Sequence, residues 1–281
     1  MERGWYKEPM PELPEVETVR RGLGQILKDQ PAITKIELKR KDLRDPIPVR
    51  QVQSLVGAKI LSIERRAKYL LLKTSAGTLL SHLGMTGTWR VAPPGDEKDH
   101  DHIYLHFSNG LRLAYRDPRR FGCFDFVARD QEQTHPKLKN LGVEPLAKAF
   151  TGSDLWQKLR GKETPIKVAL MDQKTVVGVG NIYANEALFR AGIRPQTKAC
   201  KLSRERCERL VGAVKEILAE AIAAGGSSIN DYVQASGDSG SFQKSFRVYD
   251  REGEMCETCH TRVSAQVLGG RSSFWCPSCQ K

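Results

Sequence analysis

The sequence predicts an α+β protein in which an N-terminal antiparallel β-sandwich domain with flanking helices precedes a helical domain and a small cysteine module. Short runs of alternating apolar and polar residues, separated by Gly, Pro and Asp, occupy about residues 33–128. After about residue 150 the apolar residues follow helical spacing instead. Two Cys-x-x-Cys pairs stand near the C-terminus. Strands and helices are therefore segregated along the chain, as they are in α+β folds.

Length and charge limit the possible classes of protein. A chain of 281 residues is more typical of two domains than of one. Its 45 Lys and Arg residues exceed 33 Asp and Glu, and a net charge of +12 attracts polyanions such as nucleic acids, although an ordinary basic surface is the alternative. No apolar run approaches the roughly 18 residues of a membrane helix, and the first nine residues lack the apolar core of a signal peptide. We expect a cytoplasmic monomer.

The N-terminal half begins with a predicted helix and continues with strands. From Pro14 to Leu27 the apolar residues are spaced helically, with Pro14, Glu15 and Glu17 suited to the first turn. Residues 103–107 and 111–115 alternate on either side of the turn-forming sequence SNG, which predicts a hairpin.

The second half contains three predicted helices. Thr164 would cap one helix, with Pro165 at its first position. A second would run from Asn181 to Gly192, and a third carries an apolar stripe from Leu210 to Ile222. The loop VVGVGN precedes the second helix, and it is interpreted either as a phosphate-binding loop at a helix N-terminus or as a tight turn. Asn181 would cap that helix or donate to a phosphate.

The C-terminal module has the four-cysteine spacing of a structural zinc site. Its candidate ligands are Cys256, Cys259, Cys276 and Cys279. Unmetallated cysteines in a core are the alternative, but so short a segment needs a metal for stability. Four thiolates leave no coordination position for water, so the zinc would be structural.

Between the two cysteine pairs, two strands are predicted around Gly269 and Gly270. Arg271 lies beside this turn, either as a solvated residue at its tip or as a cation presented to nucleic acid. The other cysteines are predicted to be free thiols: Cys123, Cys200 and Cys207.

Seven motifs occur in one order along the chain. They are PELPEVETVRRGL (11–23), RRAKYLL (65–71), SHLGMTG (81–87), DPRRFG (117–122), LGVEPL (141–146), VVGVGNIYANE (176–186) and GRSSFWC (270–276). From Met10 onward the chain resembles the bacterial formamidopyrimidine-DNA glycosylases (Fpg/MutM family). The resemblance implies a catalytic β-sandwich domain at 11–148, a helix–two-turns–helix DNA-binding domain with a lesion-covering loop (230–243) at 149–243, and a zinc finger at 244–281.

The resemblance also implies the reaction. Members of the family remove oxidised purines (8-oxoguanine and formamidopyrimidines) from duplex DNA during base excision repair, and then cleave the abasic site by β,δ-elimination. Pro11 matches the nucleophile that forms a Schiff base, Glu12 the acid, and Lys68 the lysine of base release and strand cleavage. Arg271 matches the phosphate-binding arginine of the finger. A free α-amine has a pKa near ~8, so part of it is neutral and nucleophilic at cellular pH.

Other matching positions contact DNA in the family. Three of them fill the gap that a flipped base leaves: Met85, Arg119 and Phe121. Asn181 matches a phosphate clamp, and His100 and Lys162 match further DNA contacts. Each has an ordinary alternative, such as core packing for Met85 and Phe121, a first-turn acid for Glu12, or a lysine within a strand for Lys68.

Residues 1–10 decide whether this chemistry is possible. If the chain begins at Met1 and stays intact, the Pro11 nitrogen is an amide and cannot form an iminium. We expect translation to start at Met10, with Met10 then removed, and residues 1–10 to be no part of the enzyme.

Two other functions are the alternatives to this glycosylase. One is a non-catalytic zinc-finger DNA-binding protein, if residues 1–10 are retained. The other is an endonuclease VIII-like glycosylase for oxidised pyrimidines, although that branch generally opens with PEGPEI-like residues.

Overall fold

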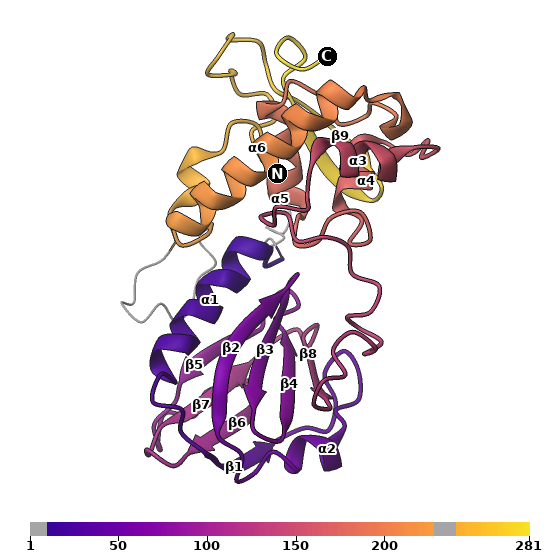
Figure 1. Ribbon diagram of the computed structural model, residues 1–281. Coiled ribbons are helices and arrows are strands. Elements are labelled where there is room, and N and C mark those ends of the chain that lie inside the picture. Colours follow the sequence, from indigo (N-terminus) through magenta and orange to yellow (C-terminus); the bar gives the residue numbers. More distant parts are fainter. Residues whose placement is uncertain (1–9, 228–239) are drawn as a thin grey trace. The chain divides into compact units, whose positions relative to one another are not determined.

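The computed structural model describes residues 10–227 and 240–281, and these form two compact units (Figure 1). The first unit contains Glu15–Lys139, and the second contains Asn140–Ser227 and Ser241–Lys281 together with Glu12–Pro14. Residues 1–9, and all but the last few residues of the predicted lesion-covering loop, lie outside the described residues.

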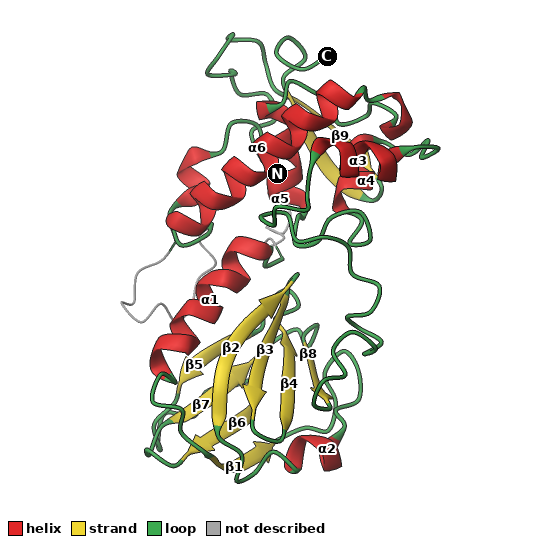
Figure 2. Cartoon of the chain, viewed as in Figure 1, coloured by secondary structure: helices red, strands yellow, loops and turns green. Residues whose placement is uncertain are grey.

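The first unit is built on two four-stranded antiparallel sheets, which confirms the predicted sandwich (Figure 2). One sheet has the order β1 (Ile33–Leu38), β6 (Asp101–Phe107), β7 (Arg112–Arg116) and β5 (Thr88–Val91). The other has the order β2 (Ile60–Arg66), β3 (Tyr69–Thr74), β4 (Gly77–His82) and β8 (Cys123–Val127). β6 and β7 pair on either side of the SNG turn, as predicted.

Apolar side chains from both sheets and from helix α1 (Leu13–Ile26) form the core of this unit. α1 contributes Val16, Val19 and Leu23, which are buried against sheet residues such as Leu70 and Phe124. The observed helix is displaced by one residue from the predicted range. The short helix α2 (Val49–Gln53) was not predicted, because five residues are too few to show a helical period.

The second unit is mainly helical (Figure 2). Its helices are α3 (Gly152–Leu159), α4 (Ile166–Met171), α5 (Asn181–Arg190) and α6 (Arg204–Ala223), with short 3₁₀ turns at Ala199–Lys201 and Phe242–Ser245. The prediction that Thr164 caps α4 is wrong by one residue. Pro165 is the N-cap, because its carbonyl accepts the first helical hydrogen bond from the Ala169 N–H at 3.0 Å. Gly192, with φ +67°, follows the end of α5 in the left-handed conformation expected there.

The C-terminal hairpin of β9 (Ser264–Leu268) and β10 (Arg271–Trp275) turns at Gly269 and Gly270, as predicted. Both glycines have positive φ, at +56° and +74°, where a side chain would be strained. Buried side chains attach the finger that contains this hairpin to the rest of the second unit. The Asn185 Oδ1 atom accepts the Phe274 N–H at 2.8 Å, and the Gln280 amide donates to the Ile193 carbonyl at 2.7 Å. The finger is thus an integral part of the second unit.

Across residues 10–227 and 240–281, no helix is both long and apolar enough to cross a membrane.

Replacement of Ser203 tests the start of α6. Its hydroxyl oxygen accepts the Arg206 N–H at 3.2 Å, which satisfies one of the free amides of the first turn. Ser203→Ala should lower the free energy of unfolding by about 1 kcal/mol. Ser203→Asn, which keeps a capping oxygen, should lower it by much less. Urea unfolding measures both values, and equal losses would contradict the capping role.

Candidate catalytic and DNA-binding site

The carboxylate of Glu12 is bound at the N-terminus of α5. Its oxygens accept the N–H groups of Gly180 at 2.7 Å, Ile182 at 2.8 Å and Tyr183 at 3.4 Å. Helix N-terminal amides lack partners within the helix and carry partial positive charge, so a carboxylate stabilises them. The Glu12 residue is only 3% exposed. The residue after Pro11 is thus held in one position within the second unit.

Glycine is required at position 180 for this contact. A Cβ atom there would lie 2.3 Å from the carboxyl carbon of Glu12. The Gln173 side chain holds the same loop, since its oxygen accepts the Gly178 N–H at 2.8 Å and its amide donates to the Val179 carbonyl at 3.2 Å. The anion at these helix amides is therefore the protein's own carboxylate. The interpretation that they bind a DNA phosphate is wrong for the three amides that Glu12 occupies.

Asn181 is the first residue of α5 and does not cap it. The N-cap is Gly180, which has no side chain to bond the first turn, and Glu12 accepts amides of that turn instead. The Oδ1 atom of Asn181 is buried without a hydrogen-bond partner among the described residues. That oxygen only accepts hydrogen bonds, whereas a phosphate clamp would use the donating NH2 group of the same amide. Its role as a phosphate clamp stays a prediction.

Arg271 is exposed at the start of β10, and a buried lysine supports the strand that carries it. The ammonium of Lys167 donates to the Ser272 carbonyl at 2.6 Å and the Ser273 hydroxyl at 2.7 Å. Burial lowers the pKa of Lys167 to about 8, with Arg271 acting in the same direction and Glu12 opposing it. Sequence reasoning missed Lys167, because it stands within the apolar run IKVALM and belongs to no charged motif.

Lys162, a predicted DNA contact, is engaged inside the second unit. Its ammonium donates to the Asp172 carboxylate at 3.2 Å and to the Thr175 hydroxyl at 2.9 Å. Part of its positive charge is therefore balanced by Asp172, and its contact with DNA stays a prediction.

The four predicted zinc ligands lie together. Their sulfur atoms are all within 4.8 Å of one another, with Cys259 and Cys276 3.3 Å apart and Cys256 and Cys279 3.9 Å apart. A tetrahedral zinc ion with Zn–S bonds of about 2.3 Å needs sulfurs roughly 3.8 Å apart. The cluster has the chemistry and the size for one zinc ion with no open position.

Lys68 lies in a two-residue turn between β2 and β3, not within a strand. Ala67 before it is buried and has φ +54°, a conformation that costs free energy in a residue other than glycine. The charge of Lys68 acts on the nearby imidazole of His82. Burial first, and then Lys68 and Arg44, lower the pKa of His82 to about 4, so this imidazole is neutral at cellular pH. Pro11 stands two residues before the start of α1 in the chain.

The residues predicted to fill the gap of a flipped base come from neighbouring loops of the first unit. The Thr86 hydroxyl, next to Met85, donates to Asp117 at 2.7 Å and accepts the Arg119 N–H at 3.2 Å. The Arg119 guanidinium lies over the Phe121 ring, 4.9 Å from its centre. Phe121 is 43% exposed, which argues against the alternative of core packing. Met85 is half-buried.

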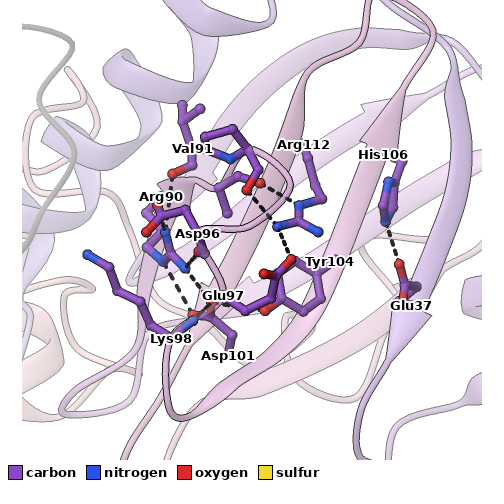
Figure 3. Close-up of polar contacts among 12 residues, drawn as sticks. Glu37, Arg90, Val91, Asp96, Glu97, Lys98, Asp101, Tyr104, His106 and Arg112 are labelled. Carbon is purple, nitrogen blue, oxygen red and sulfur yellow. Dashed lines mark hydrogen bonds and ion pairs between the residues drawn. The ribbon is translucent and has the colours of Figure 1, made fainter.

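Two arginines hold the polar loop that ends at His100 against the sheet, and Figure 3 shows their contacts with Asp96, Glu97 and Asp101. Arg90 donates to Asp96 at 2.6 Å and to the buried Asp101 at 2.5 Å. Arg112 donates to Glu97 at 2.5 Å. His100 itself is exposed and has φ +70°. The side chain predicted to contact DNA is therefore carried on an ordered loop.

Comparison with known families covers most of the chain. The family models match the formamidopyrimidine-DNA glycosylase N-terminal domain at residues 10–124, its H2TH domain at residues 141–233, and the zinc finger found in FPG and IleRS at residues 253–281. A formamidopyrimidine-DNA glycosylase of Bdellovibrio bacteriovorus is 67% identical over 272 residues, covering 97% of this chain and 100% of the relative. The chain belongs to the formamidopyrimidine-DNA glycosylase family.

Other members of this family are similar over the same length. A formamidopyrimidine-DNA glycosylase of Cereibacter sphaeroides is 48% identical, covering 97% of this chain and 100% of the relative. The crystal structure of Thermus thermophilus MutM (FPG) has a TM-score of 0.85 at 40% identity, covering 96% of this chain and 98% of that one. The Lactococcus lactis FPG in complex with Fapy-dG-containing DNA has a TM-score of 0.87 at 34% identity, covering 96% and 100%.

The zinc-finger match and the clustered sulfurs together assign one structural zinc ion to this formamidopyrimidine-DNA glycosylase family member.

Replacement of Gly180 tests the binding of Glu12 to α5. Gly180→Ala should lower the free energy of unfolding by about 1–3 kcal/mol, because the new methyl group and the carboxylate cannot share the space. Gly212→Ala is the matched control in α6, where no atom lies within 4 Å of a new Cβ. It should be neutral or stabilising by up to about 1 kcal/mol. Similar destabilisation of both variants in chemical unfolding would contradict the steric argument.

Replacement of one cysteine tests the zinc site. Cys276→Ser should remove most of the bound metal, which elemental analysis measures as about one zinc ion per wild-type chain. The hairpin that carries Arg271 should unfold with it, and protease cleavage near the C-terminus should detect the unfolding. Cys200→Ser, outside the cluster, should retain the metal. Retention of zinc by Cys276→Ser would exclude the four-sulfur site.

Proposed function

We propose that this family member excises oxidised purines from duplex DNA and cleaves the resulting abasic site, with Pro11 as the nucleophile. Family membership over 97% of the chain supports the reaction class, that of a bifunctional glycosylase and lyase. The single observation that carries the residue assignment is the anchoring of Glu12 on the amides of α5. An acidic side chain is held in one position directly after the proline in the chain.

The first step requires a form in which Pro11 is the free N-terminus. Its secondary amine attacks C1′ of the nucleoside, the N-glycosidic bond breaks, and the base leaves with the proton that the Pro11 nitrogen releases. The Glu12 carboxylate takes up a proton from solvent and gives it to the ring oxygen as the sugar opens and an iminium forms between Pro11 and C1′. Loss of the C2′ proton expels the 3′ phosphate, and a second elimination expels the 5′ phosphate. Lys68 assists base release and strand cleavage, and Arg271 binds the phosphate during elimination.

The DNA partner is an intact duplex that must be opened. Met85, Arg119 and Phe121 would occupy the space of the extruded nucleotide, with the Arg119 cation facing the unpaired base. His100, Lys162 and Asn181 would contact the backbone. Solved relatives include a MutM in complex with carbocyclic 8-oxo-G-containing DNA, at a TM-score of 0.87 and 36% identity. The enzyme would act as a monomer on chromosomal DNA in the bacterial cytoplasm.

Borohydride trapping tests the nucleophile. A form that begins at Pro11 should become covalently linked to abasic duplex DNA in the presence of borohydride, because borohydride reduces an iminium to a stable amine. A form that retains residues 1–10 should give no adduct, and peptide mapping should place the link of the shorter form at Pro11. Equal trapping of both forms would exclude Pro11 and point to a lysine instead.

The same protein distinguishes the two alternative functions. An endonuclease VIII-like enzyme would excise thymine glycol in preference to 8-oxoguanine paired with cytosine, and that preference would overturn the proposed substrate class. A non-catalytic DNA-binding protein would bind duplex DNA without excision or trapping, even when it begins at Pro11.

A further inference from the structure

Asp117 is a completely buried carboxylate of the first unit that the proposed chemistry does not use. It directly follows β7 in the sequence DPRRFG. One oxygen, Oδ1, accepts the Thr86 hydroxyl at 2.7 Å, and the other, Oδ2, accepts the Gly122 N–H at 2.8 Å. Burial of a carboxylate costs free energy unless hydrogen bonds compensate, so these two bonds hold the carboxylate and its partners in place.

The backbone of Asp117 makes further connections. Its N–H donates to the His100 carbonyl at 3.0 Å, and its own carbonyl accepts the Arg120 N–H at 3.2 Å. The same carbonyl is 2.9 Å from the Nε2 atom of His102. Asp117 therefore joins three loops, namely residues 83–87, 92–100 and 118–122.

Each of these loops carries a residue predicted to contact DNA. Met85 is in the first loop, His100 in the second, and Arg119 and Phe121 in the third. The Thr86 oxygen links the first and third loops directly, since it accepts the Arg119 N–H while donating to Asp117.

The first and third loops are also packed without spare space. A Cβ on Gly84 would lie 2.3 Å from the backbone carbonyl carbon of Phe121. A Cβ on Gly122 would lie 1.9 Å from the Tyr115 hydroxyl oxygen and 2.8 Å from the Asp117 carboxylate. Glycine at both positions lets the loops approach closely, and Asp117 then fixes their relative position.

We infer that Asp117, acting through Thr86, is a positioning residue that holds Met85, Arg119 and Phe121 as one rigid wedge for insertion into the duplex. This inference rests on the proposed function. Asp117 is buried and contacts no DNA itself. Its contribution is preorganisation, because three side chains that enter a base stack together must already hold their relative geometry. His100 is aligned with the wedge by the bond between its carbonyl and the Asp117 N–H.

Thr86 is the better position for mutation, because it is half-buried and Asp117 is wholly buried. Thr86→Val has nearly the same shape but removes the hydroxyl that donates to Asp117. Thr86→Ser keeps the hydroxyl and is the matched control. Thr86→Ala removes the hydroxyl without a branched side chain, and thermal unfolding verifies that each variant is folded at the assay temperature.

The readouts separate wedge insertion from the chemistry at the sugar. For 8-oxoguanine opposite cytosine in a duplex, Thr86→Val and Thr86→Ala should lower kcat/KM by about 10- to 100-fold, and Thr86→Ser by no more than about 3-fold. Cleavage of a single-stranded abasic oligonucleotide needs no wedge, and all three variants should retain it within about 3-fold. The preference for cytosine over adenine opposite the lesion should fall in Thr86→Val and Thr86→Ala, because Arg119 loses its fixed position.

The outcomes are distinct. Wild-type excision and opposite-base preference in Thr86→Val and Thr86→Ala would overturn the inference alone. Equal losses on duplex and single-stranded substrates would also overturn it, because they would indicate a general effect on the fold. A wild-type enzyme beginning at Pro11 that neither excises 8-oxoguanine nor cleaves the abasic oligonucleotide would overturn the proposed function, and the inference with it.

Discussion

The carboxylate of Glu12 on the N-terminal amides of α5 is the interaction on which the rest of the site depends. It satisfies amides that otherwise lack partners, and it places a negative charge at the positive end of the helix dipole. It also accounts for local sequence, since Gly180 is needed for the close approach and Gln173 shapes the loop that presents the amides. Because Pro11 is bonded directly to Glu12, the proposed nucleophile is adjacent in the chain to a residue whose side chain is held by three backbone amides.

In each unit, a buried charged residue holds the backbone near an exposed arginine. The buried residue is Lys167 for Arg271 and Asp117 for Arg119. Lys167 binds the backbone of the strand that begins with Arg271, and Asp117 accepts hydrogen bonds from the loop that carries Arg119 and from the neighbouring loop at residues 83–87. Buried charged groups are costly, but a fully hydrogen-bonded one fixes the geometry of its partners. Both arginines are exposed, while the backbone that carries them is constrained. Zinc adds the same kind of constraint to a finger too small for a core of its own.

Arg90 and Arg112 pair with acidic residues of the polar loop at residues 93–101. This loop carries several acidic residues in a protein whose proposed partner is a polyanion. Arg90 and Arg112 pair with Asp96, Asp101 and Glu97, so the acidic groups bind the loop to the sheet (Figure 3). Glu97, at the outer edge, has its pKa lowered mainly by its hydrogen bond from Arg112. Three acidic side chains of the loop that carries His100, the predicted DNA contact, are therefore paired with arginines.

The sequence by itself determined the order of sandwich, helices and finger, the hairpin turns, and the four zinc ligands. Each of these depends on spacing along the chain: a period of two for strands, a helical period for α1 and α6, and fixed intervals between cysteines. It also pointed to Pro11, Glu12, Lys68 and Arg271 through motifs, although their roles stay proposals.

Only the tertiary structure decided that Glu12 occupies the amides of the VVGVGN loop, that Lys68 stands in a turn, and that Asp117 and Lys167 are buried supports. These features depend on hydrogen bonds between residues far apart in the chain, such as Glu12 with Gly180 and Lys167 with Ser272. A local pattern carries no information about such partners, because a buried carboxylate and a solvated one look alike in sequence.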